Sequence, residues 1–478
     1  MSKDEKKITT REEDYSQWYL DVIAAADLAE HSPVKGCMVI KPYGYAIWEA
    51  IQKHLDAQFK KTGVKNAYFP MLIPERLLKR EENHIEGFAP EVAMVTHAGG
   101  KKLDEPLVVR PTSETIIYET ISGWIHSYRD LPLLLNQWAN VVRWEMRTRL
   151  FLRTTEFLWQ EGHTVHATAS EADDRARQML EIYRDLAENY MAIPVIPGVK
   201  SASERFAGAQ DTYTIEAMMQ DGKALQFATS HNLGQNFSKP FEVSFLNENQ
   251  EKEYGYQTSW GLSTRSIGGL IMVHGDDKGI IVPPKMASIQ TIITTIAPSE
   301  EDRVVVDAKA KEIEEALIEA GIRAEADLRP LRPGEKFFEW EKKGVPLRLE
   351  LGPKDLAQNQ VVLVRRDTGE KHTTPIIDVQ QKIESLLVEI QDNLFATALA
   401  RREENTVTVD TWEEFTQAIE NDKFVFAHWS GDAEDELAIK EATTATIRCV
   451  PFDAQQQAGV CVKSGKSSTK RVLFAKSY

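Results

Sequence analysis

Charged residues between positions 143 and 163 are of the types that bind a nucleotide. Val141–Glu145 predicts a strand, and the alternation of side chains along a strand would place Arg143 and Glu145 on the same face. The loop that follows contains Arg147, Arg149 and Arg153. The pair alone could be a surface ion pair, but the basic loop beside it favours a site for a polyanion such as phosphate.

A second predicted strand, Glu156–Thr164, completes this group. Its alternation puts four side chains on one side: Phe157, Trp159, Glu161 and His163. A hairpin of the two strands would bring these side chains close to Arg143 and Glu145. A cation for phosphate, a carboxylate for an amino group and a mobile cationic loop would together form a nucleotide site.

Two further motifs could serve the same chemistry. In the stretch Arg110–Glu114, Thr112 could cap a helix with Glu114 in its first turn, which is also the purely structural interpretation of the motif. In the stretch 259–269, small residues surround Arg265 ahead of an apolar helix. A helix N-terminus and a guanidinium could therefore approach a phosphate there.

The elements that must position these residues mix long helices with antiparallel strands. A helix over Ile47–Phe59 has an apolar stripe, and a second helix runs from Ser170 to Tyr190. The strands Thr212–Met219 and Lys223–Thr229 flank an Asp-Gly turn, which is typical of a hairpin. This pattern indicates an α+β domain built on an antiparallel sheet, and we expect it to span residues 1–282.

A Val-Pro-Pro stretch at 282–284 marks the end of that domain. Beyond it the chain predicts a small α/β domain over residues 283–400 and a small α+β C-terminal domain over residues 401–478. The strands and helices expected after the boundary are Val304–Asp307, Lys309–Ala320, Val345–Leu351, Gln360–Arg365 and Val379–Arg402.

Composition limits the class of protein. Of 478 residues, 42% are hydrophobic and 27% charged, which is ordinary for a globular protein and excludes a disordered chain. The formal net charge of −16 argues against non-specific coating of nucleic acid, but it is compatible with local basic patches. The N-terminus lacks the apolar core of a secretory signal, and no apolar run is long enough to span a membrane. The three cysteines are too few for a disulfide framework. We therefore expect a cytoplasmic protein without membrane contact.

Together these motifs resemble the prolyl-tRNA synthetases of the archaeal and eukaryotic type, which are class II aminoacyl-tRNA synthetases. The stretches 68–70, 143–164 and 261–269 resemble the three class-defining motifs, while 110–114 and 159–163 resemble prolyl-specific signatures. The resemblance covers essentially the whole chain. It implies a class II antiparallel-sheet catalytic domain, an α/β anticodon-binding domain and a small C-terminal domain. The implied activity is ATP-dependent activation of L-proline to prolyl-adenylate and transfer to the 3′ end of tRNA(Pro).

The resemblance also implies roles for single residues. For ATP, bound with Mg²⁺, it implies Arg143 at the α-phosphate and Arg265 at the γ-phosphate as catalytic residues, with Glu145 at the adenine amino group. The other ATP-binding residues that it implies are Arg153, Thr155, Gln226 and Thr229. For proline, it implies that Thr112 and Glu114 bind the imino group and that Arg143 reaches the carboxylate. The rest of the implied proline pocket is Trp159, Glu161, His163, Phe206, Ser230 and His231.

In the anticodon-binding domain, the resemblance implies that Phe337, Glu341 and Arg348 stack on and hydrogen-bond to two guanines. The structural alternative is a solvated helix face at 337–343. The helix Ile47–Phe59 and the strand up to Pro70 resemble the element through which class II synthetases dimerise. We therefore expect a homodimer, although the apolar stripe alone would also fit a monomer core.

The C-terminal domain departs from the family pattern. Relatives of this type often carry four zinc-binding cysteines there, whereas this chain has only Cys449 and Cys461, with Ala433 and Ser464 at the other two aligned positions. Two thiolates rarely form a closed tetrahedral site. We therefore expect a degenerate zinc-binding domain in which structural zinc is weakly bound or absent.

Two other functions remain open at this point. A threonyl or seryl synthetase is one, but the threonyl enzymes hold a catalytic zinc through a cysteine, and no pocket residue here is a cysteine. A catalytically inactive paralogue should have lost Arg143, Glu145 or Arg265, and all three are present. The segment between His163 and Ser259 leaves no room for the editing domain that bacterial-type relatives insert there, so the pocket itself must select proline.

Overall fold

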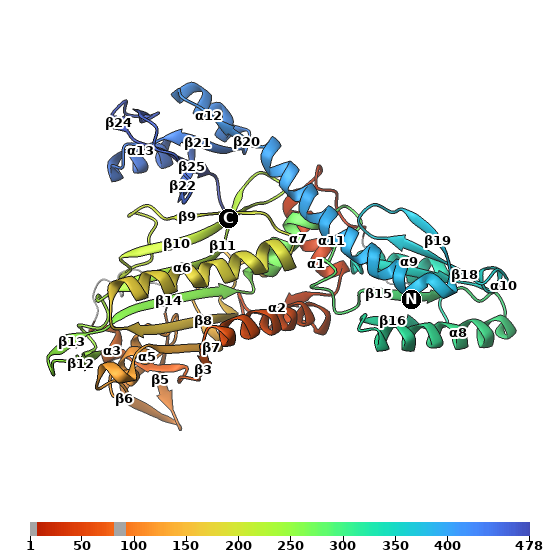
Figure 1. The fold of residues 1–478 in the computed structure, drawn as a ribbon, viewed down its shortest axis with the longest axis horizontal. Coiled ribbons are helices and arrows are strands. Elements are labelled where there is room, and N and C mark those ends of the chain that lie inside the picture. Colours follow the sequence, from red (N-terminus) through yellow and green to blue (C-terminus); the bar gives the residue numbers. More distant parts are fainter. Residues whose placement is uncertain (1–6, 81–91) are drawn as a thin grey trace.

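The structure, a computed structural model, describes residues 7–80 and 92–478. Residues 1–6, which belong to the N-terminal segment considered above, lie outside that part. Figure 1 shows a large sheet flanked by helices, a smaller α/β unit on the right and a C-terminal unit at the upper left. In the described part of the chain, no helix is both long and apolar enough to cross a membrane.

The first region contains the antiparallel sheet that the sequence predicted. Its central strands lie in the order β9-β10-β11-β14-β8-β7, and every neighbouring pair among them is antiparallel. They are β7 (Leu133–Val142), β8 (Glu156–His166), β9 (Val195–Val199), β10 (Asp211–Met218), β11 (Ala224–Gly234) and β14 (Tyr256–Ser263).

Helices and short strands surround this sheet. The helices are α1 (Tyr15–Ala25), α2 (Pro42–Lys61), α3 (Glu75–Leu78), α5 (Glu114–Ile121), α6 (Ala169–Asp185) and α7 (Arg265–His274). The strands are β1 (Ala29–His31), β2 (Met38–Ile40), β3 (Lys65–Asn66), β4 (Leu72–Pro74), β5 (Ala93–Ala98), β6 (Lys101–Val109), β12 (Ser244–Leu246) and β13 (Lys252–Tyr254). The Tyr183 hydroxyl of α6 hydrogen-bonds to Gln160 of β8, so α6 covers the sheet face opposite to Glu161.

Both predicted hairpins are present. β7 pairs with β8, which places Gln137 opposite Glu161, and β10 pairs with β11 through a turn in which Gly222 has a φ of +79°. One detail was wrong, because β7 ends at Val142 and does not continue to Glu145. The Arg143 N–H still donates to the Thr155 carbonyl, but Trp144 beyond it is exposed and has no core to pack against.

The α/β unit contains a five-stranded mixed sheet in the order β16-β15-β17-β18-β19. Its strands are β15 (Thr291–Thr295), β16 (Ala324–Asp327), β17 (Leu347–Leu351), β18 (Gln360–Arg365) and β19 (Lys371–Pro375). Its helices are α8 (Glu300–Glu319), α9 (Pro333–Lys342), α10 (Pro353–Ala357) and α11 (Val379–Glu404).

The predicted strand Val304–Asp307 is wrong, because these residues belong to α8. The Ser299 side chain caps that helix by accepting from the Asp302 N–H, and the acidic first turn suits the positive end of the helix dipole. Val306 is buried while Val304 and Val305 are exposed. Helical spacing therefore outweighed the preference of the valines for a strand.

The C-terminal unit is joined to the first region by backbone pairing. It contains β20 (Thr406–Thr408), α12 (Trp412–Glu420), β21 (Phe424–His428), α13 (Ala433–Thr443), β22 (Thr446–Pro451), β23 (Gly459–Val460), β24 (Ser467–Ser468) and β25 (Arg471–Ala475). β22 pairs antiparallel with β9, so the two units share one 11-stranded sheet. In Figure 1, α11 runs from the α/β unit to the C-terminal unit as one helix, across the boundary expected at residue 400.

Candidate functional site

One cavity brings together the residues that the sequence singled out for chemistry. It lies over β8, β10, β11 and β14 and contains about 1010 Å³ of empty space, including its open mouth. The lining residues that the sequence had selected are Thr112, Glu114, Arg143, Trp159, Glu161, His163, Phe206, Gln226, Thr229, His231 and Arg265.

Two buried carboxylates form the acidic end of this cavity. The Thr112 hydroxyl donates to Glu114 Oε2. Glu161 Oε1 accepts hydrogen bonds from the Ser113 hydroxyl and from Gln137 Nε2. Burial acts to raise the pKa of Glu161, but the hydrogen bonds and the neighbouring His163 outweigh it and hold the pKa below its usual value. The acidic end of the cavity is therefore suited to a cationic group.

Histidines form the wall beside the carboxylates. His163 Nε2 lies 3.3 Å from Glu161 Oε2, and His163 Nδ1 lies 3.1 Å from the Tyr118 hydroxyl. His231 is held between the Thr212 and Thr229 hydroxyls and lies against the Phe206 ring, with centroids 4.5 Å apart. Burial, together with the charge of His163, lowers the pKa of His231 to about 3. The neutral imidazole of His231 and the Phe206 ring beside it suit a small apolar ring.

Arginines form the other end of the cavity. Arg265 is the first residue of α7, and its Nε donates to the Leu152 carbonyl at 3.0 Å. The Arg143 Nε donates to the Pro111 carbonyl at 3.0 Å, while its guanidinium lies 5.5 Å from the centre of the Trp159 ring. Burial and the nearby Arg143 and Arg153 lower the pKa of Arg265 to about 10, so it stays charged at neutral pH. Converging cations of this kind bind a polyanion.

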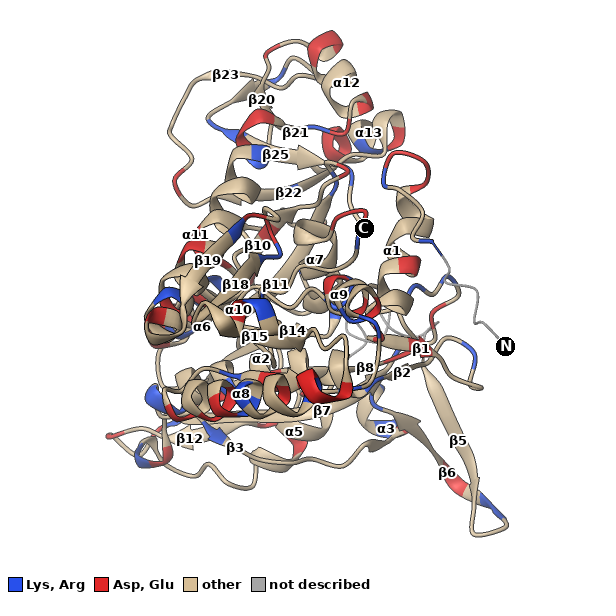
Figure 2. Ribbon diagram, turned by 90° about the vertical axis from the view of Figure 1, so that its right-hand side faces the viewer, with Lys and Arg blue, Asp and Glu red and all other residues tan. Residues whose placement is uncertain are grey.

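The arginine end continues into an adjoining pocket that holds Glu145. Arg143, Glu145, Arg153 and Arg265 line this pocket, and Glu145 Oε2 lies 3.7 Å from Arg153 Nε. Glu145 is therefore separate from Glu161 and His163, contrary to the expected single group, because β7 ends before it. Figure 2 shows acidic residues on helices such as α8, α12 and α13, interspersed with basic ones.

Two residues predicted for the proline and ATP sites line neither the cavity nor the adjoining pocket. Ser230 lies between Thr229 and His231 on β11, and alternation turns its side chain to the other face of the sheet. The Thr155 side chain faces Gly36, and only its carbonyl contacts the site, through the Arg143 N–H.

The sequence missed the residues that support the site. Gln137 and Ser113 hold Glu161, Tyr118 holds His163, and Thr212 holds His231. The predicted strand began at Val141 and did not reach Gln137, which β7 pairs with Glu161. Tyr118 had no signal in the sequence, since it reaches the site from α5 by tertiary packing.

The residues expected to bind an anticodon lie together on the α/β unit. Phe337 and Glu341 are one turn apart on α9, and the Arg348 guanidinium of β17 lies 4.3 Å from the centre of the Phe337 ring. Glu341 and Arg348 line a pocket that also contains Lys278 and Lys371. An aromatic ring, a carboxylate and several cations are suited to a single-stranded nucleic acid.

The residues near Cys461 do not fit a zinc site. Burial acts to raise the pKa of the Cys461 thiol, but hydrogen bonds from the Ser464 side chain and from nearby backbone groups outweigh it and lower the pKa. Asp435 accepts from the Ser430 and Ser464 hydroxyls, both at 2.6 Å. Cys449 lies instead in an apolar cluster on β22. Within residues 7–80 and 92–478, no group of three or more His, Cys, Asp or Glu side chains could hold a metal ion.

Family models match three successive stretches of the chain. A model described as the tRNA synthetase class II core domain (G, H, P, S and T) matches residues 96–274. A model described as an anticodon binding domain matches residues 292–386, and one described as Prolyl-tRNA synthetase, C-terminal, matches residues 412–478. The matches follow the order of the three regions of the fold.

Proteins named Proline–tRNA ligase are similar to this chain over their full length. The protein from Porphyromonas gingivalis is 54% identical, and the alignment covers 100% of both chains. The protein from Bacteroides fragilis is likewise 54% identical over 100% of both chains. The protein from Chlorobaculum tepidum is 56% identical over 99% of both chains.

Proposed function

Since the chain belongs to the prolyl-tRNA synthetase family, we propose that it activates L-proline with ATP and transfers the prolyl group to the 3′ end of tRNA(Pro). The predicted fold, a class II core followed by an anticodon-binding and a C-terminal domain, is confirmed. The restriction to the archaeal and eukaryotic type stays a prediction. One observation carries the proposal, namely a single cavity with Arg143 and Arg265 at one end and Glu114 and Glu161 at the other.

The proposed reaction needs no protein nucleophile. The proline carboxylate attacks the α-phosphorus of ATP, pyrophosphate leaves, and prolyl-adenylate forms. A ribose hydroxyl of the terminal adenosine of the tRNA then attacks the activated carbonyl and displaces AMP. The protein must hold the reacting groups in line and stabilise the charge that develops on the phosphate oxygens.

The arginine end is the proposed ATP site. Arg143 would bind the α-phosphate and the proline carboxylate, which places it at both reacting groups. Arg265 would bind the γ-phosphate, and Mg²⁺ bound with ATP would offset part of the phosphate charge. Glu145 would accept from the adenine amino group, and the site would be completed by Arg153, Gln226, Thr229 and the backbone of Thr155. The cationic lining and the half-buried position of Arg265 support these roles.

The acidic end is the proposed proline site. The cationic imino group has two N–H donors, and Thr112 and Glu114 offer oxygen acceptors in the cavity. Trp159, Phe206 and His231 would surround the ring, with Glu161 and His163 behind it. Ser230 is not part of this proposal, because its side chain faces away.

The remaining proposals concern anticodon recognition, the domain boundaries and the oligomeric state. We propose that Phe337, Glu341 and Arg348 recognise the anticodon, and that the domains span 1–282, 283–400 and 401–478.

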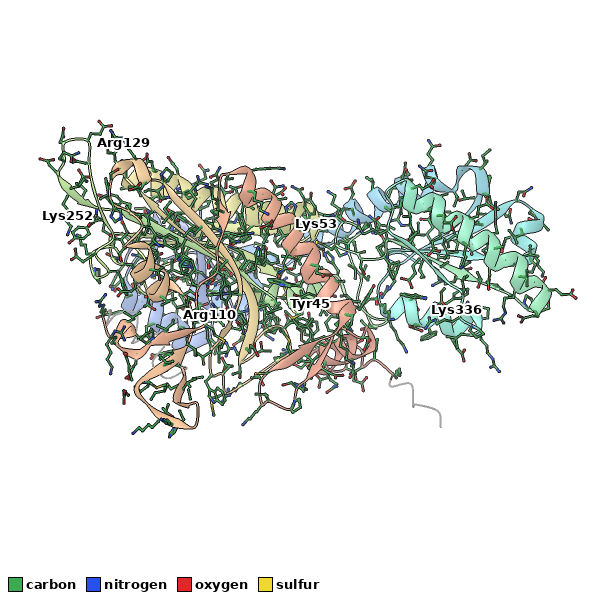
Figure 3. All side chains as sticks on the ribbon, turned by 90° about the horizontal axis from the view of Figure 1, so that it is seen from below. Tyr45, Lys53, Arg110, Arg129, Lys252 and Lys336 are labelled. Carbon is green, nitrogen blue, oxygen red and sulfur yellow. The ribbon has the colours of Figure 1, made fainter. Side chains whose placement is uncertain are left out.

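We also propose a cytoplasmic homodimer. The apolar stripe of α2 is buried in the core of its own chain, so a partner would contact the outward side of α2, where Figure 3 shows Tyr45 and Lys53, and the exposed Tyr68.

The proposed activity is tested by amino-acid-dependent exchange of pyrophosphate into ATP. Each of the twenty amino acids is supplied in turn to the purified protein. Proline should give the highest kcat/KM, with measurable exchange for alanine and cysteine, because a pocket loses only about 1–3 kcal/mol per missing methylene. Exchange that is absent with proline, or faster with threonine or serine, would contradict the proposal.

A further inference from the structure

A buried ion triad joins the C-terminal unit to the wall of the ATP end of the cavity. Lys200 Nζ lies 2.8 Å from Glu216 Oε1, while Arg448 Nε and Nη2 lie 3.0 and 2.9 Å from Glu216 Oε2. The side chains of Lys200 and Glu216 are 1% and 0% exposed, and that of Arg448 is 7% exposed. Glu216 belongs to β10, whereas Arg448 comes from β22 of the C-terminal unit.

The carboxylate of Glu216 is fully engaged. Besides the two cations, its Oε1 accepts from the Thr214 hydroxyl at 2.8 Å. A buried carboxylate that loses one of two cationic partners is strongly destabilised, because water cannot replace the missing charge. Arg448 also donates from Nη1 to the Thr446 hydroxyl, which fixes the direction of its guanidinium.

The triad lies on the face of the sheet that forms the cavity. Along β10 and β11, Thr212 is opposite His231 and Thr214 is opposite Thr229. Glu216 is the next residue on this face and is opposite Gln226, which lines the cavity. The register of the two strands is irregular between Ile215 and Glu216, so the pairing of Glu216 with Gln226 follows a β-bulge. Arg448 thus holds the carboxylate that lies directly across the strand pair from a cavity residue.

We propose that Arg448 of the C-terminal unit is a positioning residue for the ATP end of the cavity, acting through Glu216 on Gln226. The role rests on the proposed function. Two cations and one carboxylate also leave a net positive charge behind the triphosphate site. The charges of Arg448 and Glu216 act on the Arg265 guanidinium in opposite directions. The triad is therefore electrostatically coupled to a cavity residue. Removing the Arg448 charge should therefore weaken ATP binding more than proline binding.

The test compares Arg448→Met with Arg448→Lys in proline-dependent exchange. Arg448→Met should raise the KM for ATP roughly tenfold, since one unit charge is lost from a buried site behind the cavity wall. The KM for proline should change less than twofold. Arg448→Lys keeps the charge and one hydrogen bond, so it should restore most of the ATP affinity. Lys463→Met is the matched control, because it removes an exposed charge from the same unit, where the ammonium lies 4.0 Å from the centre of the Trp412 ring.

The outcomes separate this role from a merely structural one. Equal increases in both KM values, or no rescue by lysine, would overturn the inference. If Arg448→Met does not fold, Lys200→Met removes a cation from the other oxygen of the same carboxylate, and the same selective rise in the KM for ATP is expected. An inactive wild-type protein would refute the proposed function itself, whereas an active wild type with an unaffected Arg448→Met variant would refute only this inference.

Discussion

At the scale of single residues, the carboxylates of the cavity depend on neighbours that hold their charge. Glu161 is buried and would be costly to ionise without donors, and it receives them from Ser113 and Gln137. Gln137 also accepts the Phe69 N–H through its Oε1, so its amide cannot turn over without losing a hydrogen bond. The amide orientation is thereby fixed with its nitrogen toward Glu161.

Gln137 offers a direct test of this support. Gln137→Met removes the donor to Glu161 while keeping a side chain of similar length. A hydrogen bond to a charged group contributes about 1.5–3 kcal/mol, so the KM for proline should rise by at least about tenfold. The KM for ATP, measured in the same exchange assay, should stay within twofold. A variant whose KM for proline equals that of the wild type would show that Glu161 does not need this donor.

Strand alternation predicted much of the site, and one error came from not applying it. It correctly placed Phe157, Trp159, Glu161 and His163 on one face, and all four line the cavity. The same rule excludes Ser230, which lies between two cavity residues on β11. Family motifs assign positions in a sequence, whereas the direction of a side chain depends on the strand that carries it.

At the scale of elements, α7 joins the cationic site to the core. It begins at Arg265 in the cavity and ends at His274, which is buried. His274 Nε2 lies 2.8 Å from the Met191 carbonyl, an arrangement in which the neutral ring donates from Nε2. Burial lowers the pKa of His274 to about 4, well below the ordinary value of 6.5.

The lowered pKa of His274 predicts a loss of stability in mild acid. Between pH 6.5 and about 4 the unfolded chain binds a proton on this histidine that the folded chain does not. The free energy of unfolding should therefore fall as the pH is lowered through this window, by up to about 1.4 kcal/mol per pH unit for this residue. Urea denaturation of His274→Gln should show a shallower dependence between pH 7 and pH 5, whatever its stability at pH 7. Parallel pH dependences of wild type and variant would refute this assignment.

Helices and hairpins were largely predictable, and the exceptions have physical reasons. The stripe of α2 and the Asp-Gly hairpin depend on local spacing and turn chemistry, which the sequence displays directly. The sequence predicts a strand over Val304–Asp307, and its three consecutive valines favour one. The stretch is helical instead, because Ser299 caps α8 and the buried residues recur at helical spacing.

At the scale of the whole molecule, the order of the three regions was predictable but their connection was not. The Pro-Pro pair at 283–284 marked the first boundary, and changes in pattern marked the rest. The pairing of β22 with β9 uses backbone groups at strand edges, for which side chains give no pattern. The ion triad of Lys200, Glu216 and Arg448 is likewise visible only once these strands lie side by side.

The C-terminal unit should not depend on zinc. Asp435 is held by two hydroxyl groups and lies 3.3 Å from Lys466 Nζ, a hydrogen-bonded cluster that links the start of α13 to the segment after β23. Purified protein should contain well below one zinc per chain, and chelation should leave the melting temperature unchanged. Asp435→Ala, as the positive control, should lower it. One tightly bound zinc per chain with Cys461 among its ligands would contradict this prediction.

The central claim is that Arg265 and Arg143 hold one triphosphate beside the proline pocket, and Arg265→Ala tests it most directly. Arg129→Ala is the matched control, because Arg129 lines neither pocket that contains Arg265, and its guanidinium lies 5.1 Å from the centre of the Tyr128 ring. Figure 3 shows Arg129 near the upper left edge of the molecule. The account predicts that Arg265→Ala lowers proline-dependent pyrophosphate exchange by about 10²-fold or more, the effect of losing about 3 kcal/mol of charge stabilisation, while the control keeps wild-type activity. Exchange by Arg265→Ala at the wild-type rate would contradict it.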